Sequence, residues 1–398
     1  MARLLAFRVA KGLAPCSPET GAYCKARQRL PEKALAELVR STGRQLMANA
    51  ERRWLWKGRS VKIADGSGLS MPDTPANQKA YPKSSHLPDG VGFPLMRLLV
   101  VFSLAVGTVL DAAMGRFKGK QTGELSLFRT LDDALEPGDV LVADRLFANF
   151  WDVARLFVRG IDVVMRMHAG RSKVSFRGRG HSTENRRIWW RKRKRPEWMT
   201  QEQYDLLPEW LRLRALRVDV HQRGFRTKRL VLVTTLTDAQ AYPAADVAEL
   251  YRRRWQAELN LRSLKTTLQM DILRGKSPDV VRKEVWAHLL VYNIVRGLMA
   301  QAATAVGVRP DEVSFKGALQ TFNAFWPHLL TAPTSADAEE RWRAMIEAIG
   351  HHRVGDRPDR YEPRAARYRK RKFPRLRMTR AEARRFLRDG GRFPGDKD

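Results

Sequence analysis

The segment GDVLVADRLFANFWDVARLFVRGIDVVMRM, residues 138–167, contains two apolar runs separated by a stretch with helical spacing. The first run ends at Asp144, the helical stretch covers residues 149–158, and the second run closes on Met165–Met167. A strand, a helix and a strand in this order predict a βαβ unit with parallel pairing. We therefore expect an α/β protein.

The neighbouring segments extend this unit on both sides. RSVKIADGSG, residues 59–68, predicts a strand that ends at Asp65 in a glycine-rich turn, and residues 95–110 predict buried strands. Helices are predicted before residue 58, at 244–270 and at 280–306. Residues 169–228 are dense in arginine and lysine and are interpreted as an insertion between core elements. This insertion carries four tryptophans, Trp189, Trp190, Trp198 and Trp210.

The charge of the chain indicates a polyanionic partner. Seventy-four Lys and Arg residues against 42 Asp and Glu give a net charge of +32 over 398 residues, which favours nucleic-acid binding. The two cysteines make neither a disulfide framework nor a zinc site of usual spacing. The longest apolar run, residues 98–110, is too short to cross a membrane. We expect no membrane association and a cytoplasmic location, on the nucleoid through DNA binding.

The segment LYRRRWQAELNLRSLKTTLQM, residues 250–270, places one acid among cations and a phenol. On a continuous helix of about 100° per residue, Tyr251, Arg254, Glu258 and Lys265 fall within a stripe about 60° wide. Arg262 and Trp255 flank this stripe. A solvated face of ion pairs is the alternative interpretation, since charged helices commonly carry one.

Three acids stand where a metal site can be built. Asp65 and Asp144 each end a predicted strand, and Glu258 lies in the middle of a predicted helix. Carboxylates from such elements can hold two Mg²⁺ or Mn²⁺ ions for phosphodiester chemistry. An aspartate at a strand end can equally be a turn or cap residue.

Several motifs resemble one known family. The pattern Y-x2-R-x3-E-x6-K resembles the signature of the insertion-sequence-four family of DDE transposases. IADGSG at 63–68 and VADRLFANF at 142–150 resemble the two segments that hold that family's aspartates. MPDTPANQKAYP at 71–82, TGAYCKARQRLPEKAL at 20–35 and YEPRAARYRKR at 361–371 resemble further segments in the same order.

The resemblance implies a fold and a reaction. The fold is a ribonuclease-H-like mixed sheet flanked by helices, with a β-rich insertion before the catalytic helix. Asp65, Asp144 and Glu258 are its metal-binding catalytic triad, with two Mg²⁺ (or Mn²⁺) ions as cofactors. The implied activity is that of a DNA transposase, which cleaves at transposon ends and transfers the strand to target DNA, acting as a homodimer in the synaptic complex; some relatives pass through a DNA hairpin.

The resemblance also implies roles for the cationic and aromatic residues. Tyr251, Arg254 and Lys265 would bind phosphates near the scissile bond. Arg262, Trp255 and Arg166 are further expected DNA contacts, with core packing as the alternative for Trp255. A tryptophan of the insertion could stack on a flipped base, although large aromatics more often pack in a core.

Five regions follow from these interpretations. They are an N-terminal helical region (1–58), the first part of the catalytic core (59–168), the basic, Trp-rich insertion (169–228), the second part of the core with the signature helix (229–310) and a C-terminal helical and basic region (311–398). The family commonly carries an additional N-terminal domain for end recognition, and the 19 residues before Thr20 predict that this domain is shortened or missing. Two alternatives are therefore an inactive or N-terminally truncated DNA-binding protein derived from a transposase, and a nuclease that cuts without joining.

Overall fold

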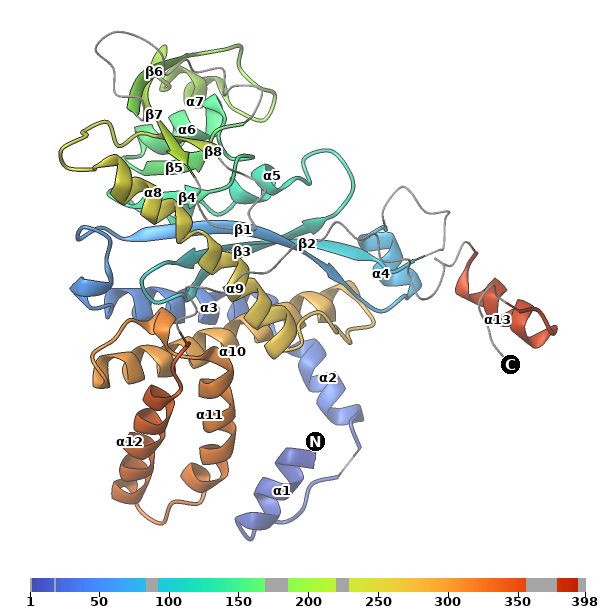
Figure 1. Ribbon diagram of the computed structural model, residues 1–398. Helices are drawn as coiled ribbons and strands as arrows, with labels where there is room; N and C mark the ends of the chain where they lie inside the picture. Colours follow the sequence, from blue (N-terminus) through green and yellow to red (C-terminus); the bar gives the residue numbers. More distant parts are fainter. Residues whose placement is uncertain are drawn as a thin grey trace.

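One mixed sheet organises the protein. The structure is a computed structural model that describes residues 2–17, 19–83, 92–168, 185–219, 229–355 and 378–392. Within these residues, eight strands lie in the order β3-β2-β1-β4-β5-β8-β7-β6 (Figure 1). Their bounds are β1 Val61–Ser70, β2 Leu95–Ser103, β3 Val109–Arg116, β4 Val140–Ala143, β5 Asp162–Arg166, β6 Asn185–Arg191, β7 Trp210–Asp219 and β8 Arg229–Thr234.

The pairing of the strands matches the expected fold class. β1, β2 and β3 are antiparallel, whereas β1, β4 and β5 are parallel. Three antiparallel strands continued by two parallel ones form a ribonuclease-H-like mixed sheet, so the α/β prediction is confirmed. The predicted strand, helix and strand of residues 138–167 are β4, α6 and β5. Asn149 caps α6, because its side chain accepts the backbone N–H of Asp152 at 3.0 Å.

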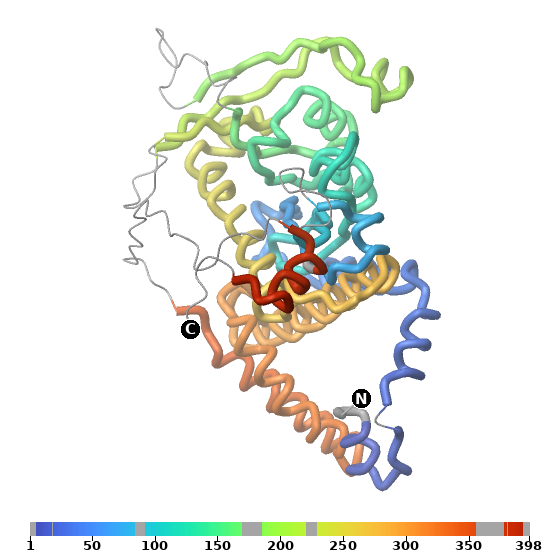
Figure 2. The backbone as a smooth tube through the Cα atoms, turned by 90° about the vertical axis from the view of Figure 1, so that its right-hand side faces the viewer, coloured from blue at the N-terminus to red at the C-terminus, as the bar shows by residue number. Residues whose placement is uncertain are grey.

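Helices cover both faces of the sheet. Their bounds are α1 Ala2–Ala10, α2 Gly21–Arg29, α3 Glu32–Ala48, α4 Pro75–Ala80, α5 Glu124–Phe128, α6 Phe150–Val158, α7 Gln201–Asp205, α8 Ala244–Arg252, α9 Trp255–Arg262, α10 Pro278–Ala305, α11 Phe315–Leu330, α12 Ser335–His351 and α13 Arg380–Arg388. Short 3₁₀ turns occupy Arg52–Trp54 (η1), Asp132–Ala134 (η2) and Pro310–Glu312 (η5), and a π-helix occupies Ser263–Thr267 (η4). α11 and α12 form a hairpin that extends away from the sheet (Figure 2).

The two faces of the sheet build two separate cores. Ile63 and Val142 point into the core that contains side chains of α3, α8, α9 and α10. Ala64 and Leu141 point into the other core, with α5 and α6. The alternation along β1 and β4 therefore decides which helices each side chain meets.

The prediction that the first strand ends at Asp65 is wrong. β1 continues to Ser70, and Asp65 lies in its middle. The glycines that suggested a turn keep extended backbone because they stay paired with β2: Gly66 lies opposite Leu99 and Gly68 opposite Arg97. Backbone hydrogen bonding to a neighbouring strand has overridden the local preference of glycine for turns.

The prediction of one continuous helix over 244–270 is also wrong. α8 ends at Arg252, α9 begins at Trp255, and the last turn is the π-helix η4. At the break the backbone bonds shorten to three residues, with Arg254 N–H bonded to the Tyr251 carbonyl and Ala257 N–H to the Arg254 carbonyl. The break coincides with the contact that Arg254 makes with Asp65 on β1, so tertiary contacts have overridden helical propensity here.

The described part of residues 169–228 is β-rich, as expected. It forms β6, α7 and β7, and β7 pairs with β8, so these strands continue the same sheet. The motif at 361–371 and residues 169–184 and 220–228 lie outside the described residues.

Candidate active site

The parallel pairing of β1 with β4 brings Asp65 and Asp144 together. Ile63 pairs with Val142 in this register, and each aspartate lies two residues further along the chain. Because side chains alternate between faces, both aspartates belong to the face that α8 and α9 cover. The backbone N–H of Leu146 donates to Asp144 Oδ1 at 2.7 Å and so orients this carboxylate.

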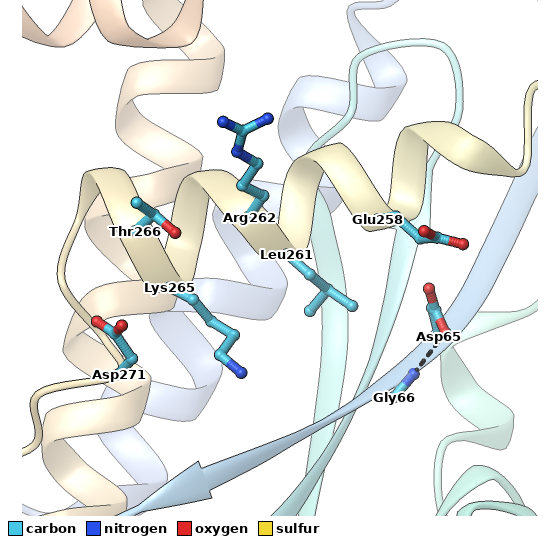
Figure 3. Close-up of a pocket in the computed structure, with 8 residues that line it drawn as sticks. All are labelled: Asp65, Gly66, Glu258, Leu261, Arg262, Lys265, Thr266 and Asp271. Carbon is cyan, nitrogen blue, oxygen red and sulfur yellow. Dashed lines mark hydrogen bonds between the residues drawn. The ribbon is translucent and has the colours of Figure 1, made fainter. Parts of the chain in front are cut away.

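Glu258 reaches the same place from α9. The carboxyl groups of Asp65 and Glu258 face each other between β1 and α9 (Figure 3). The guanidinium of Arg254 contacts both, because its Nη2 lies 2.9 Å from Glu258 Oε1 and its Nη1 lies 3.8 Å from Asp65 Oδ2. The structure therefore joins two members of the predicted triad through one cation.

Electrostatics set Asp65 apart from an ordinary aspartate. Burial raises the pKa of Asp65 to about 6, and the negative charges of Glu258 and Asp144 act in the same direction. The Gly66 N–H, which donates to Asp65 Oδ1 at 2.9 Å, and the Arg254 guanidinium oppose this rise. A buried carboxyl among like charges is a group that gains from a bound cation.

Tyr251 lies close enough to Arg166 and Asp144 to interact with them electrostatically. Burial raises the pKa of the Tyr251 phenol, which lies within the electrostatic influence of Arg254, Arg166 and Asp144. Tyr251 thus stays protonated at neutral pH and can donate a hydrogen bond. Arg166 is the last residue of β5, next to β4 in the sheet.

Lys265 is held against β1. Its Nζ donates to Ser67 Oγ and to the Gly68 carbonyl, both at 3.1 Å. Lys265 lies in the π-helix η4, whose wider turn is closed by the Leu268 N–H on the Ser263 carbonyl. π-turns are frequent at functional sites. The cleft between η4, α9 and β1 has a volume of about 440 Å³ and is lined by Asp65, Gly66, Glu258, Leu261, Arg262, Lys265, Thr266 and Asp271.

The three acids suit a hard divalent cation in donor type but are not gathered around one point. Carboxylate oxygens are the ligands that Mg²⁺ and Mn²⁺ prefer. In the part of the chain that the structure describes, no three His, Cys, Asp or Glu side chains approach closely enough to hold a metal ion. Arg254 lies between Asp65 and Glu258 instead, so the cation position that these carboxylates share is filled by a guanidinium.

The remaining predicted DNA contacts differ in position. Arg262 is exposed and lines the cleft. Trp255 is 48% exposed, so core packing does not explain it. In the insertion, Trp189 and Trp210 are each 55% exposed, whereas Trp198 lies beneath the guanidinium of Arg129 at 3.5 Å.

A comparison of sequences identifies the family of the chain. Residues 56–294, which include all three acids, match the family described as transposase DDE domain. The chain belongs to this family. The resemblance of this chain to the DDE transposases, inferred from the signature and the two aspartate motifs, is thereby confirmed.

Individual relatives of the family cover different shares of the chain. The transposase InsG for insertion sequence element IS4 of Escherichia coli (strain K12) is 28% identical over 299 residues, which is 74% of this chain and 64% of that protein. The transposase for insertion sequence element IS421 of Escherichia coli is 42% identical over 65 residues, 16% of this chain and 18% of that protein. The match thus spans less than two thirds of the length of either relative.

One solved structure is also similar. It is the piggyBac transposase synaptic complex with hairpin DNA, with a TM-score of 0.39 and 9% sequence identity over 76% of this chain and 59% of that one.

No helix in the described residues is long and apolar enough to span a membrane.

Sequence reasoning missed Thr266 and Asp271, which line the cleft, and Ser67, which accepts a hydrogen bond from Lys265. Ser67 could have been found from strand periodicity, since it lies two residues after Asp65 and so shares its face. Thr266 and Asp271 depend on the π-turn and the loop after it, for which the sequence carries no clear signal.

Proposed function

We propose that this chain is a DNA transposase that cleaves DNA at transposon ends and joins the strand to target DNA, with Asp65, Asp144 and Glu258 as its catalytic triad. One observation carries the proposal: the β1–β4 register aligns the two aspartates on the face where Glu258 and Asp65 contact one guanidinium. Three carboxyls from β1, the end of β4 and α9, beside a cleft that also carries Arg262 and Lys265, suit phosphodiester chemistry.

Two Mg²⁺ or Mn²⁺ ions held by these carboxyls would activate the attacking hydroxyl and stabilise the leaving oxygen. The chain's own residues position the DNA. Lys265 is fixed by Ser67 and Gly68 with its charge at the cleft, where it can bind a phosphate. Tyr251 and Arg166 offer a phenol and a guanidinium near the acids, and Arg262 offers a second guanidinium at the exposed rim of the cleft.

The outer surface suits a long DNA partner. The net charge of +32 supports binding to the phosphates of transposon ends and target DNA, and synapsis of two ends calls for a homodimer. Trp255 and the exposed tryptophans of the insertion, Trp189 and Trp210, present aromatic surface on which unpaired bases can stack.

Isosteric substitution of the triad tests the proposal. Asp65→Asn, Asp144→Asn and Glu258→Gln should each abolish Mg²⁺-dependent nicking of DNA that carries the element's ends, while DNA binding in a gel-shift assay stays within about twofold, since no phosphate contact is removed. Glu37→Gln, an exposed carboxylate on α3, is the matched control and should cut normally. Normal cutting by any triad variant would refute the assignment.

The products of the same assay separate the alternatives. A transposase leaves a 3′-hydroxyl and then joins that strand to a target plasmid. A nuclease yields nicks with no joined product, and an inactive DNA-binding protein shifts the DNA without nicking it. Either of these two results would replace the proposed reaction.

A further inference from the structure

The side chain of Arg254 is paired with two acids of the proposed triad. Its guanidinium lies 2.9 Å from Glu258 Oε1 and 3.8 Å from Asp65 Oδ2, and only 19% of the side chain is exposed. A DNA phosphate that binds this guanidinium would compete with the two carboxylates for its positive charge. The same contacts hold the two carboxyls in place, although they belong to elements 193 positions apart in the sequence.

The position of Arg254 also excludes a metal ion between these acids. A guanidinium and a divalent cation repel each other, and both need the same carboxylate oxygens. In the described residues no three acids gather closely enough for an ion, and two acids of the proposed triad contact this guanidinium instead. Lys265 provides a contrast, because its ammonium in the same cleft is bonded to Ser67 and Gly68 and to neither acid.

We propose that Arg254 is a positioning residue with two alternative partners: it bridges Asp65 and Glu258 in the metal-free protein, and it moves to a DNA phosphate when divalent ions take the carboxylates. This inference rests on the proposed function of the triad and adds to it. It makes metal binding and phosphate binding reciprocal. Metal releases Arg254 to DNA, and a phosphate that draws Arg254 away strengthens metal binding by the same factor.

The first test measures Mn²⁺ binding to the full chain without DNA. The electron paramagnetic resonance signal of free Mn²⁺ reports how much of the metal is unbound. Arg254→Gln should bind Mn²⁺ at least about fivefold more tightly than the unchanged chain, because the competing cation is gone. Lys265→Gln removes the same charge from the same cleft and should change Mn²⁺ affinity less than about twofold. Equal tightening in both variants, or none in Arg254→Gln, would overturn the exchange.

Asp65→Asn in the same experiment separates this inference from the function on which it rests. If the triad is the metal site, this variant loses Mn²⁺ affinity. Unchanged affinity in Asp65→Asn would refute the site itself. Loss in Asp65→Asn with no gain in Arg254→Gln would refute the exchange alone.

The second test measures whether Arg254 contacts a DNA phosphate when metal is present. The salt dependence of binding to a short DNA duplex is compared between the unchanged chain and Arg254→Gln, without metal and with Ca²⁺ to keep the DNA uncut. The difference in slope should be near zero without metal and about 0.9 with it, the value for one phosphate contact. An equal difference in both conditions would refute the inference.

A variant that keeps the charge covers the case in which Arg254→Gln folds poorly. Lysine at position 254 has a single ammonium and cannot span both carboxylates as the fork of arginine does. Arg254→Lys should therefore bind Mn²⁺ more tightly than the unchanged chain and keep part of the metal-dependent slope. Circular dichroism of each variant verifies the fold before either measurement is interpreted.

Discussion

Replacing Arg129 with methionine should destabilise the protein by about 3–5 kcal/mol, because it leaves a buried carboxylate without its cation. The Asp152 side chain is completely buried, and that of Arg129 is 17% exposed. The pair is bidentate, with Arg129 Nε to Asp152 Oδ1 and Nη2 to Oδ2 both at 2.8 Å. Asn149 Nδ2 donates to the same carboxylate at 2.8 Å but brings no charge.

The magnitude follows from the lost counter-ion and from a lost stacking contact. The Arg129 guanidinium lies 3.5 Å from the ring centre of Trp198, so the substitution also removes a cation–π contact worth about 0.5–2 kcal/mol. Methionine retains much of the apolar stem, which limits the cavity. Urea unfolding followed by circular dichroism measures the change.

The control for this prediction is the same substitution in an exposed pair. Arg44→Met removes the partner of Glu37 on α3, where the two side chains are 57% and 59% exposed, and should cost at most about 1 kcal/mol. Adding Asp152→Asn to Arg129→Met should recover much of the loss, since no charge then stays buried. A loss below about 1 kcal/mol for Arg129→Met, or no recovery in the double variant, would refute the reasoning.

Four further results are expected. Lys265→Ala should weaken DNA binding and lower its salt slope by about 0.9, measured by fluorescence anisotropy at several salt concentrations; an unchanged slope would contradict a phosphate contact. Asn293→Leu should cost about 3 kcal/mol or more in thermal unfolding, because the buried amide accepts from Thr108 Oγ1 and the Val109 N–H and donates to two carbonyls; a loss near zero would contradict this. Asp65→Asn should gain stability relative to the unchanged, metal-free chain as pH rises from about 4 to about 6, by at most about 3 kcal/mol. The reason is the raised pKa of Asp65, because of which the folded state holds a proton that the unfolded chain releases in this pH range. A pH-independent difference in stability would contradict the raised pKa. Alanine at both Trp189 and Trp210 should weaken binding of single-stranded DNA by about 1–3 kcal/mol for each stacked base and leave thermal stability within about 0.5 kcal/mol per site; unaffected binding would exclude these rings as stacking surfaces.

The βαβ unit could be predicted because its signals are local. The apolar runs of β4 and β5 and the cap at Asn149 need no information from the rest of the chain. The end of β1 could not be predicted, since Gly66 and Gly68 stay extended only through pairing with β2. Strand periodicity along β1 was sufficient to place Ser67 beside Asp65, but the predicted turn concealed it.

The signature residues were identified, but not their geometry. A single helix put Tyr251, Arg254, Glu258 and Lys265 on one stripe, whereas the structure breaks that helix at Arg254 and widens it into a π-turn at Lys265. Both irregularities occur where a side chain contacts β1, Arg254 through Asp65 and Lys265 through Ser67 and Gly68. Contacts between distant segments are not encoded in a 20-residue pattern, which is why the spacing alone predicted an ideal helix.

The separation of Asp65 and Glu258 along the chain has a consequence for synthesis. Glu258 follows Asp65 by 193 positions, and β6, β7 and β8 are made in between. At roughly 5–20 residues per second, the ribosome needs about 10–40 s to extend the chain from one acid to the other. Under the proposed function, an unfinished chain that stops before residue 258 would therefore carry two of the three acids and lack a complete triad.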